Sequence, residues 1–420
     1  MRLNRRVVSL AKDAQAASRE LLSLTEAEKN CILNDMAKAI IKGKAAILRA
    51  NKRDIKAAAK RGLSSALVDR LTLNNKRIIG MADSLKQVAR LKNPVGRRIS
   101  SRRRPNGLLI RKICVPIGVI AIIYEARPNV TSDCAGLCLK SGNSVILRGG
   151  SEALNSNLAI YRLLKGVLRK YKLNQAAVSM LTTSDRSAVD TLLKLDKYID
   201  LVIPRGGEGL ISKVAASSRI PVIKHYKGIC HIFVDDWADL NLAQRVCFNA
   251  KVQRPGVCNA METLLVHRDV AVRFLPGMIK QFIDAGVQIR GCALTRRIAK
   301  AFKIKKAKDK DYHTEYLDLV LSVKVVDGLK QAIDHINHYG SKHSDAIITE
   351  NKKHAKIFTK RVDSACVYVN ASTRFTDGYQ FGMGAEIGIS TDKIHARGPM
   401  ALEELTSYKY VVSGKGQIRR

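Results

Sequence analysis

One cysteine of the chain lies in a setting that suits a nucleophile. Cys258 follows a Pro-Gly pair in the stretch VQRPGVCNAMETLLVH (252–267), directly before an apolar run. A nucleophilic cysteine reacts as the thiolate, which nearby cations or backbone N–H groups stabilise. Lys251 and Arg254 are close in sequence and are candidates for that role. A small buried cysteine at the start of a core strand fits the same pattern, and composition alone favours that alternative.

Two strand–glycine–helix junctions are candidates for phosphate recognition. They are ILRGGSEA (146–153) and IPRGGEGL (203–210), with Arg148 and Arg205 each preceding a glycine pair. A helix N-terminus offers unpaired N–H groups, glycine lets an anion approach the backbone, and a guanidinium binds phosphate at two points. Neither junction is a GxGxxG or Walker motif, so each one alone also fits an ordinary turn.

Other catalytic chemistry finds little support. There is no GxSxG motif for a serine hydrolase, and the nine cysteines are scattered without a CxxC pair. Cys134 and Cys138 could share one helix face, but free cysteines usually pack as small hydrophobic residues. We therefore expect neither a disulfide framework nor a metal site.

The composition predicts a globular protein of the cytoplasm. The 420 residues are 46% hydrophobic, enough for two or three cores, and no apolar stretch approaches the ~18 residues that span a bilayer. The net charge of +38 invites a nucleic-acid interpretation. However, basic residues are spread along the whole chain and only 5% of residues are aromatic, so a basic surface that steers anionic small molecules is the favoured interpretation.

The spacing of apolar residues predicts the helices and strands that carry these candidate residues. The first ~95 residues predict helices, with a capping box at Thr25 and Glu28 and further helices over 43–60 and 74–92. After that, short apolar runs alternate with helical patterns, which is typical of parallel strands with crossover helices. The charged segment 100–118 contains PNG between runs that can pair as a hairpin, and we expect it to protrude.

The longest motifs resemble a known family. They include YEARPNVTSDCAGLCLKSGNSVILRGG, NAKVQRPGVCNAMETLLVH and SACVYVNASTRFTDGYQFGMGAEIGIS. Together with IPRGGEGL they resemble the gamma-glutamyl phosphate reductase family of the aldehyde dehydrogenase superfamily, in order and over essentially the whole chain. The resemblance implies an α/β fold with a Rossmann-type cofactor domain, an α/β catalytic domain and a β-arm. The implied boundaries are 1–98 and 119–238 for the cofactor domain, 239–380 for the catalytic domain, and 99–118 with 396–420 for the oligomerisation arm and tail.

The resemblance also implies a reaction. It is NADPH-dependent reduction of L-glutamyl 5-phosphate to L-glutamate 5-semialdehyde with release of phosphate, the second step of proline synthesis from glutamate. No amino-acid kinase segment precedes the motifs, so the expectation is a stand-alone reductase that is functionally coupled to glutamate 5-kinase. A homo-oligomer with a small-molecule substrate is expected, without a specific nucleic acid and without a membrane.

Carried over residue by residue, the resemblance assigns roles. Cys258 matches the nucleophile, Asn129 the oxyanion-holding asparagine, and Glu315 the glutamate that binds the nicotinamide ribose. The remaining cofactor residues implied are Arg148 and Gly149 near the adenosine ribose, and Gly206 and Gly207 at the pyrophosphate. The candidates for the charged groups of the substrate are Arg127, Lys224, His225 and Arg374, with Glu386 for the ammonium.

One departure from the oxidising relatives is informative. Those enzymes carry a general-base glutamate about thirty residues before the cysteine, whereas this chain has KHYKGIC at 224–230. A reductase must not activate water to hydrolyse its thioester, so the missing carboxylate favours acyl-phosphate reduction. The alternatives are a dehydrogenase that oxidises glutamate semialdehyde, and a non-catalytic basic protein associated with RNA.

Overall fold

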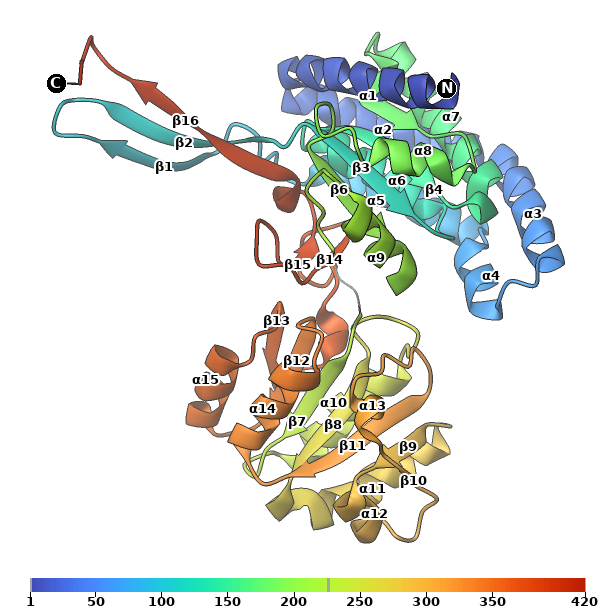
Figure 1. The fold of residues 1–420 in the computed structure, drawn as a ribbon, viewed down its shortest axis with the longest axis vertical. Helices are drawn as coiled ribbons and strands as arrows, with labels where there is room; N and C mark the ends of the chain where they lie inside the picture. The colour runs from blue at the N-terminus through green and yellow to red at the C-terminus, as the bar shows by residue number, and fades with distance from the viewer. Residues whose placement is uncertain (1, 225–226, 420) are drawn as a thin grey trace. The chain divides into compact units, whose positions relative to one another are not determined.

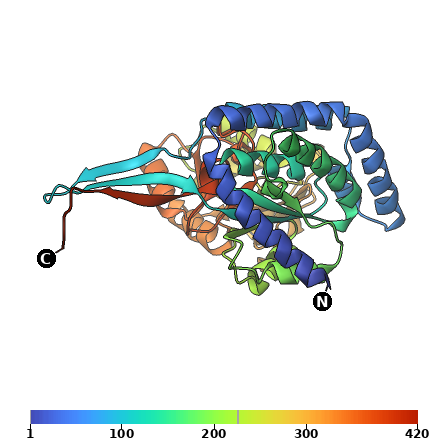
Figure 2. The same ribbon diagram turned by 90° about the horizontal axis from the view of Figure 1, so that it is seen from above.

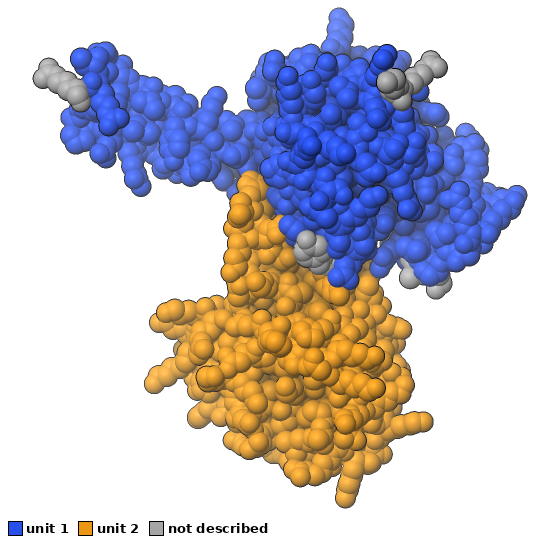
Figure 3. Space-filling model, in the orientation of Figure 1, with its two compact units in different colours: residues 1–224, 382–388, 400–420 blue, residues 225–381, 389–399 orange. Residues whose placement is uncertain are grey.

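The structure is a computed structural model that describes residues 2–224 and 227–419. The chain forms two compact units, which are described separately (Figure 3). Unit 1 contains residues 1–224, 382–388 and 400–420, and unit 2 contains residues 225–381 and 389–399. The alternation of helices and parallel strands confirms the predicted α/β class.

The first part of unit 1 is helical, as the sequence predicts. Its helices are α1 (Arg2–Glu20), α2 (Glu26–Lys42), α3 (Lys44–Lys60), α4 (Ser65–Leu71) and α5 (Asn75–Arg90). The capping box that starts α2 is confirmed, because Thr25 Oγ1 accepts from the Glu28 amide at 3.3 Å and Glu28 Oε2 accepts from the Thr25 amide at 2.8 Å. These reciprocal bonds satisfy two N–H groups that a helix start leaves unpaired.

A four-stranded parallel sheet forms the core of unit 1. Its strands are β3 (Val119–Tyr124), β4 (Ser144–Gly149), β5 (Val178–Met180) and β6 (Leu201–Arg205), in the order β5-β4-β3-β6. The other helices of this unit are α6 (Asn129–Lys140), α7 (Leu154–Lys170), α8 (Arg186–Leu192) and α9 (Glu208–Ser217). Val7, Ala11 and Ala14 of α1 pack in one cluster with β3 and β4. Tyr124 pairs with Gly149 and with Arg205, so three strands end at the same edge of the sheet.

A three-stranded antiparallel sheet extends from unit 1 as an arm (Figures 1 and 2). It consists of β1 (Arg98–Arg103), β2 (Leu109–Pro116) and β16 (Thr406–Ser413), in the order β1-β2-β16. The predicted hairpin around PNG is confirmed by the pairing of β1 with β2. The side chains of Tyr408, Tyr410 and Val412 on β16 are exposed.

Unit 2 is built on a seven-stranded parallel sheet. Its strands are β7 (Cys230–Val234), β8 (Met261–His267), β9 (Gln288–Gly291), β10 (Lys305–Lys306), β11 (Val320–Val326), β12 (Ser344–Ile348) and β13 (Cys366–Val369), in the order β10-β9-β11-β8-β7-β12-β13. The helices are α10 (Leu240–Val252), α11 (Arg268–Asp284), α12 (Ala293–Ile298), α13 (Asp309–Tyr312), α14 (Leu329–Tyr339) and α15 (Lys352–Arg361). Two further short strands are β14 (Gly388–Ser390) and β15 (Gly398–Met400).

Helices cover both faces of the seven-stranded sheet. Ile232 and Val234 of β7 pack in a cluster with residues of α10 and α11, while Phe233 packs on the opposite face with residues of α14 and α15. This two-sided burial explains why the central strands are continuous apolar runs. Since β7 pairs with β8 and β12, it belongs to unit 2, whereas the boundary expected from the sequence at residue 238 places this strand in the cofactor domain.

Among residues 2–224 and 227–419, no helix is both long enough and apolar enough to cross a membrane.

Candidate active site

Cys258 lies in a short loop between α10 and β8 of unit 2. The cysteine is half-buried, and the loop around it is held by its neighbour Asn259. The Asn259 side-chain amide donates to the Thr376 carbonyl at 2.8 Å, and Thr373 Oγ1 donates to the Asn259 carbonyl at 2.7 Å. The position of the sulfur therefore depends on the turn over residues 373–376, which follows β13.

Gly228 packs directly against the backbone of Cys258. A Cβ atom on Gly228 would lie 1.9 Å from the Cys258 carbonyl oxygen, so no side chain fits there. The Gly228 amide also donates to Glu315 Oε1 at 2.8 Å. Through this glycine the structure brings Cys258 and Glu315, two residues selected from the sequence, to one corner of unit 2. That corner lies at the N-terminal ends of β7 and β8.

The cation beside Cys258 is not Lys251. Lys251 is buried and pairs with Glu262 at 2.6 Å, so its charge is already balanced. Arg374 instead donates to Gln253 Oε1 at 2.8 Å and to Asn259 Oδ1, on either side of the cysteine in sequence. Burial and then the nearby Arg254 lower the pKa of the Arg374 guanidinium, whereas Cys258 acts in the opposite direction. Arg374 is therefore the cation that the structure connects to the loop of Cys258.

The buried pair of Lys251 and Glu262 supports the same corner. Glu262 Oε1 accepts from the Leu317 amide at 3.1 Å, which ties the segment of Glu315 to β8. Burial raises the pKa of Glu262 to about 7 and lowers that of Lys251, and the ion pair opposes both shifts. Removal of either partner would leave a buried group unpaired, which is strongly destabilising.

Cys230 is a neighbour of Cys258, the predicted nucleophile, that sequence reasoning missed. Its Sγ donates to the Cys258 carbonyl at 3.2 Å. Burial raises the pKa of the Cys230 thiol well above its ordinary value, so Cys230 remains a neutral donor at pH 7. Nothing in the sequence separates it from an ordinary core cysteine at the start of a strand, because the two cysteines meet only when β7 pairs with β8.

The C-terminal edge of the sheet in unit 1 holds the candidate cofactor pocket. A pocket with a volume of about 330 Å³ opens beside the ends of β3 and β4. Its charged lining residues are Glu125, Arg148, Glu152, Arg186 and Lys213. Parallel sheets of this kind bind nucleotides outside the carboxyl ends of their strands. The predicted residue Arg148 lies in this pocket, and burial is the first cause of the lowered pKa of its guanidinium.

The glycine turn before α9 already receives a carboxylate. Gly207 precedes the first residue of α9, and its amide donates to Glu125 Oε2 at 2.9 Å. A Cβ atom on Gly206 would lie 2.3 Å from the same oxygen. Gly149 is equally close-packed, because a Cβ atom there would lie 2.0 Å from Asn157 Nδ2. The turn therefore accepts an anion, and a cofactor phosphate at this position has to displace Glu125.

Asn129 is the first residue of α6 in unit 1 and is exposed. Its side-chain amide donates to Asp133 Oδ2 at 3.0 Å, and Asp133 Oδ1 accepts from Ser84 Oγ at 2.8 Å. Burial is the main reason that the pKa of Asp133 rises to about 6. Since Asp133 uses only one N–H of the Asn129 amide, the second N–H can serve an oxyanion.

The residues predicted to bind the substrate are divided between the units. Arg127, Lys224 and Glu386 belong to unit 1, and Arg374 belongs to unit 2. Of these, Arg374 is the one that the structure connects to the loop of Cys258. His225 lies outside the described residues.

Comparison with known proteins defines the class. The model of the aldehyde dehydrogenase family matches residues 4–288. An acetylating aldehyde dehydrogenase from Geobacillus thermoglucosidasius has the same fold, with a TM-score of 0.72 and 16% identity over 100% of this chain and 98% of that one. The parallel sheets and the cysteine loop thus belong to a chain of the aldehyde dehydrogenase superfamily, whose enzymes are oxidoreductases that use a nicotinamide cofactor.

Two relatives define the family more closely. A gamma-glutamyl phosphate reductase from Thermodesulfovibrio yellowstonii is 54% identical over 420 residues, covering 100% of both chains. The crystal structure of a gamma-glutamyl phosphate reductase from Thermotoga maritima superposes with a TM-score of 0.96 at 48% identity, covering 99% of this chain and 100% of that one. The chain belongs to the gamma-glutamyl phosphate reductase family, as its motifs predicted.

The pKa of Asp133 predicts a pH-dependent stability. Because this pKa is about 6 in the folded state and about 4 in an unfolded chain, ionisation destabilises the fold between these values. We expect Asp133→Asn to gain about 1 kcal/mol in free energy of unfolding, relative to the unmodified protein, between pH 5 and pH 7, and no more above pH 7. Urea unfolding at several pH values measures this gain. Asp83→Asn, at an exposed position of α5, is the control, and a difference independent of pH would contradict the prediction.

Proposed function

We propose that this chain reduces L-glutamyl 5-phosphate to L-glutamate 5-semialdehyde with NADPH and releases phosphate, as a step of proline synthesis. The observation that carries the proposal is the corner of unit 2 where Gly228 joins Cys258 to Glu315. It occurs in a chain that is 54% identical, over its whole length, to a gamma-glutamyl phosphate reductase. The substrate is inferred from the names of the relatives, and the residues proposed to act on it lie at this corner.

The reaction divides into two steps at Cys258. The thiolate attacks the acyl carbonyl carbon, a C–S bond forms, and the C–O bond to phosphate breaks with its electron pair leaving on phosphate. A reduced nicotinamide cofactor, for which Arg148 and Glu315 are the proposed binding residues, would supply the hydride that reduces the thioester carbon. The resulting hemithioacetal collapses, which releases the aldehyde and returns the thiolate. We assign Glu315, whose Oε1 accepts from the Gly228 amide, to a hydrogen bond with the nicotinamide ribose.

The negative charge that develops on the acyl oxygen needs donors. We assign the Asn129 amide and the Cys258 N–H to this role, and one such donor is worth about 3 kcal/mol to a transition state. Asp133 orients the Asn129 amide by accepting one of its N–H groups at 3.0 Å. The guanidinium groups of Arg374 and Arg254 are suited to bind the phosphate or carboxylate of the substrate.

The competing activity, oxidation of the semialdehyde to the free acid, requires a base that activates water. No residue of the segment 224–230 is acidic, and Gly228 of that segment packs on Cys258 without room for a side chain. A thioester at Cys258 therefore lacks a carboxylate from this segment to hydrolyse it. The RNA-associated alternative does not account for the pairing of Glu315 with the Cys258 loop.

The cofactor pocket supports NADPH over NADH. Arg148, Arg186 and Lys213 place three cationic side chains on a pocket that also contains Glu125 and Glu152. A ribose 2′-phosphate adds negative charge, which guanidinium groups bind through charge-assisted hydrogen bonds. Arg186 and Lys213 are exposed, so both can move onto such a phosphate.

The proposal extends to the setting of the enzyme. A homo-oligomer assembled through the arm, a cytoplasmic location and functional coupling to glutamate 5-kinase remain predictions. The exposed row of Tyr408, Tyr410 and Val412 on β16 supports the arm as an oligomerisation element, because a sheet edge with apolar side chains favours pairing.

The reverse reaction tests the proposed activity. We expect oxidation of glutamate semialdehyde with NADP to require added phosphate or arsenate, because the thioester at Cys258 is released by phosphate and not by water. Formation of NADPH is followed by absorbance, with and without phosphate. Glutamate production that is independent of phosphate would refute the reductase proposal and favour the oxidising alternative.

Substitution of the nucleophile gives a second prediction. Cys258→Ser should lower turnover by at least about 1,000-fold, because an alkoxide is not available at neutral pH, while binding of NADPH stays within about twofold. Turnover is measured by NADPH consumption, and cofactor binding is measured by fluorescence. Cys247→Ser, at a buried cysteine of α10 outside the loop, is the matched control. A Cys258→Ser enzyme with most of its activity would rule out the nucleophile assignment.

The lining of the pocket predicts that loss of Arg186 weakens the preference for NADPH over NADH. Arg186→Ala should raise the KM for NADPH about tenfold and leave the KM for NADH unchanged, because one charged hydrogen bond to the 2′-phosphate is lost. Arg169→Ala removes an exposed arginine of α7 outside the pocket and should change neither KM. Equal effects on both cofactors would show that Arg186 does not contact the 2′-phosphate.

A further inference from the structure

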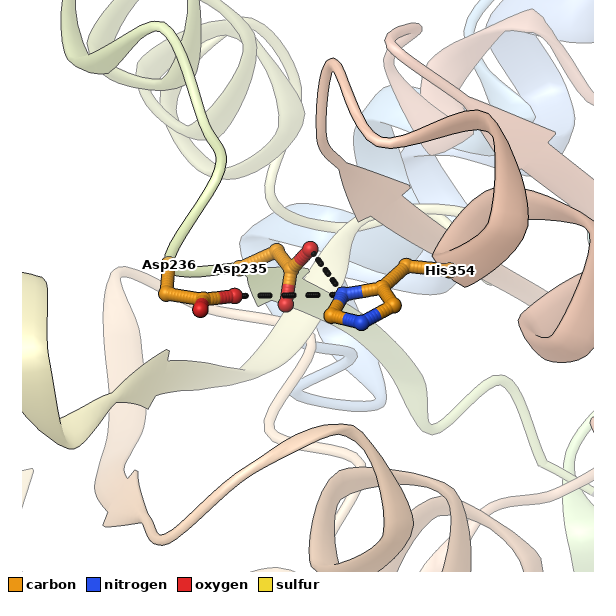
Figure 4. Close-up of side chains that lie close together, drawn as sticks. All are labelled: Asp235, Asp236 and His354. Atoms are coloured by element: carbon orange, nitrogen blue, oxygen red, sulfur yellow. Dashed lines mark hydrogen bonds and ion pairs between the residues drawn. The ribbon is translucent and has the colours of Figure 1, made fainter.

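A cluster of two carboxylates and one imidazole lies at the opposite end of the unit 2 sheet from Cys258. Asp235 and Asp236 directly follow β7, and His354 lies in the first turn of α15. One ligand atom of each residue lies within 4.8 Å of those of the other two. Figure 4 shows the three side chains pointing toward one another. Because Cys258 precedes β8 and a five-residue strand spans about 16 Å, the cluster is remote from the candidate active site.

His354 is the centre of the cluster. Its Nδ1 lies 2.8 Å from Asp235 Oδ2 and 3.8 Å from Asp236 Oδ1. Ligands bound at about 2.1 Å to a divalent cation lie about 3.0–3.8 Å from one another, so a small outward movement of the side chains accommodates an ion. Two carboxylate oxygens and one imidazole nitrogen form a donor set that suits a first-row divalent metal ion.

The buried carboxylate is only partly satisfied by the protein. Asp235 is fully buried, and its Oδ2 accepts from Thr349 Oγ1 at 2.6 Å. Its Oδ1 is buried without a hydrogen-bond partner among the described residues, and Asp236 Oδ1 is in the same situation. Buried carboxylate oxygens are normally bonded, and an unpaired one is costly. These two oxygens beside one imidazole form a donor set that a cation would satisfy.

The neighbouring backbone holds the ligands in place. The Asp235 amide donates to the Ile348 carbonyl at 3.1 Å, and Asn351 Oδ1 accepts from the His354 amide at 3.2 Å at the start of α15. Asp236 and His354 are half-buried, with side-chain exposures of 31% and 29%, so an ion and its water ligands can reach the cluster. The cluster is therefore rigid on its Asp235 side and open on the other.

We propose that Asp235, Asp236 and His354 bind one divalent first-row metal ion, with water completing its coordination. The ion links the end of β7 to the start of α15. An imidazolium in place of the metal ion is the alternative, because an ion pair of His354 with Asp235 neutralises one of the two carboxylates. The proposal concerns a site separate from the reductase chemistry and does not depend on it.

Titration with Co²⁺ tests the proposal on the full-length protein after treatment with a chelator. We expect one Co²⁺ per chain by calorimetry, with a visible spectrum that lacks the charge-transfer band of a thiolate ligand. Asp236→Asn and His354→Ala should each weaken binding at least about tenfold. His313→Ala is the matched control, since it removes a histidine that faces Asp309 at 3.8 Å elsewhere in the unit, and it should bind as the unmodified protein does.

Circular dichroism establishes whether each variant is folded. If His354→Ala does not fold, binding of Co²⁺ to Asp236→Asn still tests the proposal. Three results would overturn the proposal: no stoichiometric binding, a spectrum with a thiolate band, or equal affinity in the cluster variants and in the unmodified protein. If the protein is folded and binds no stoichiometric Co²⁺, the cluster is assigned to the ion pair between the His354 imidazolium and Asp235.

Discussion

The contact of Gly228 with the backbone of Cys258 is the constraint on which the candidate site depends. It requires β7 and β8 to be neighbours in the sheet, and it leaves no space for a side chain at position 228. Through the Gly228 amide it also fixes Glu315, which arrives from a distant part of the chain. One close approach of two backbones thus brings together the proposed nucleophile and the residue proposed to bind the nicotinamide ribose.

Buried polar groups hold this corner, and each is stabilised by a specific partner. Lys251 and Glu262 form a pair at 2.6 Å, and the second carboxylate oxygen of Glu262 accepts from the Leu317 amide. Such a pair offsets the cost of burying two charges only when its geometry is good, so it fixes the arrangement of the strand and the following segment more than it adds stability. In unit 1, Asp133 has a comparable function toward Asn129, because it restricts the amide to one orientation.

The two ends of the sheet in unit 2 have different chemistry. At the N-terminal end, the cationic side chain of Arg374 bonds to the loop that carries Cys258. The C-terminal end places two carboxylates beside His354, which favours a cation. In unit 1, the Gly207 amide of the glycine turn donates to Glu125, so the turn already binds a carboxylate where we propose a cofactor phosphate. Although the net charge of the chain is +38, the chain thus carries local sites that suit anions and local sites that suit a cation.

The fold class, the helices of the first ~95 residues, the hairpin of the arm and the family were all predictable from the amino-acid sequence alone. These features depend on local periodicity, on caps such as Thr25 with Glu28, and on long motifs. The sequence also indicated Cys258 and Glu315, but only by resemblance. The tertiary fold decides which cation accompanies the cysteine. Lys251, a candidate from the sequence, is buried against Glu262, whereas Arg374 bonds to Gln253 and Asn259 on either side of Cys258 in sequence. Gly228, Cys230 and the cluster of His354 became visible only in three dimensions, because their partners lie 28 to 119 residues away along the chain.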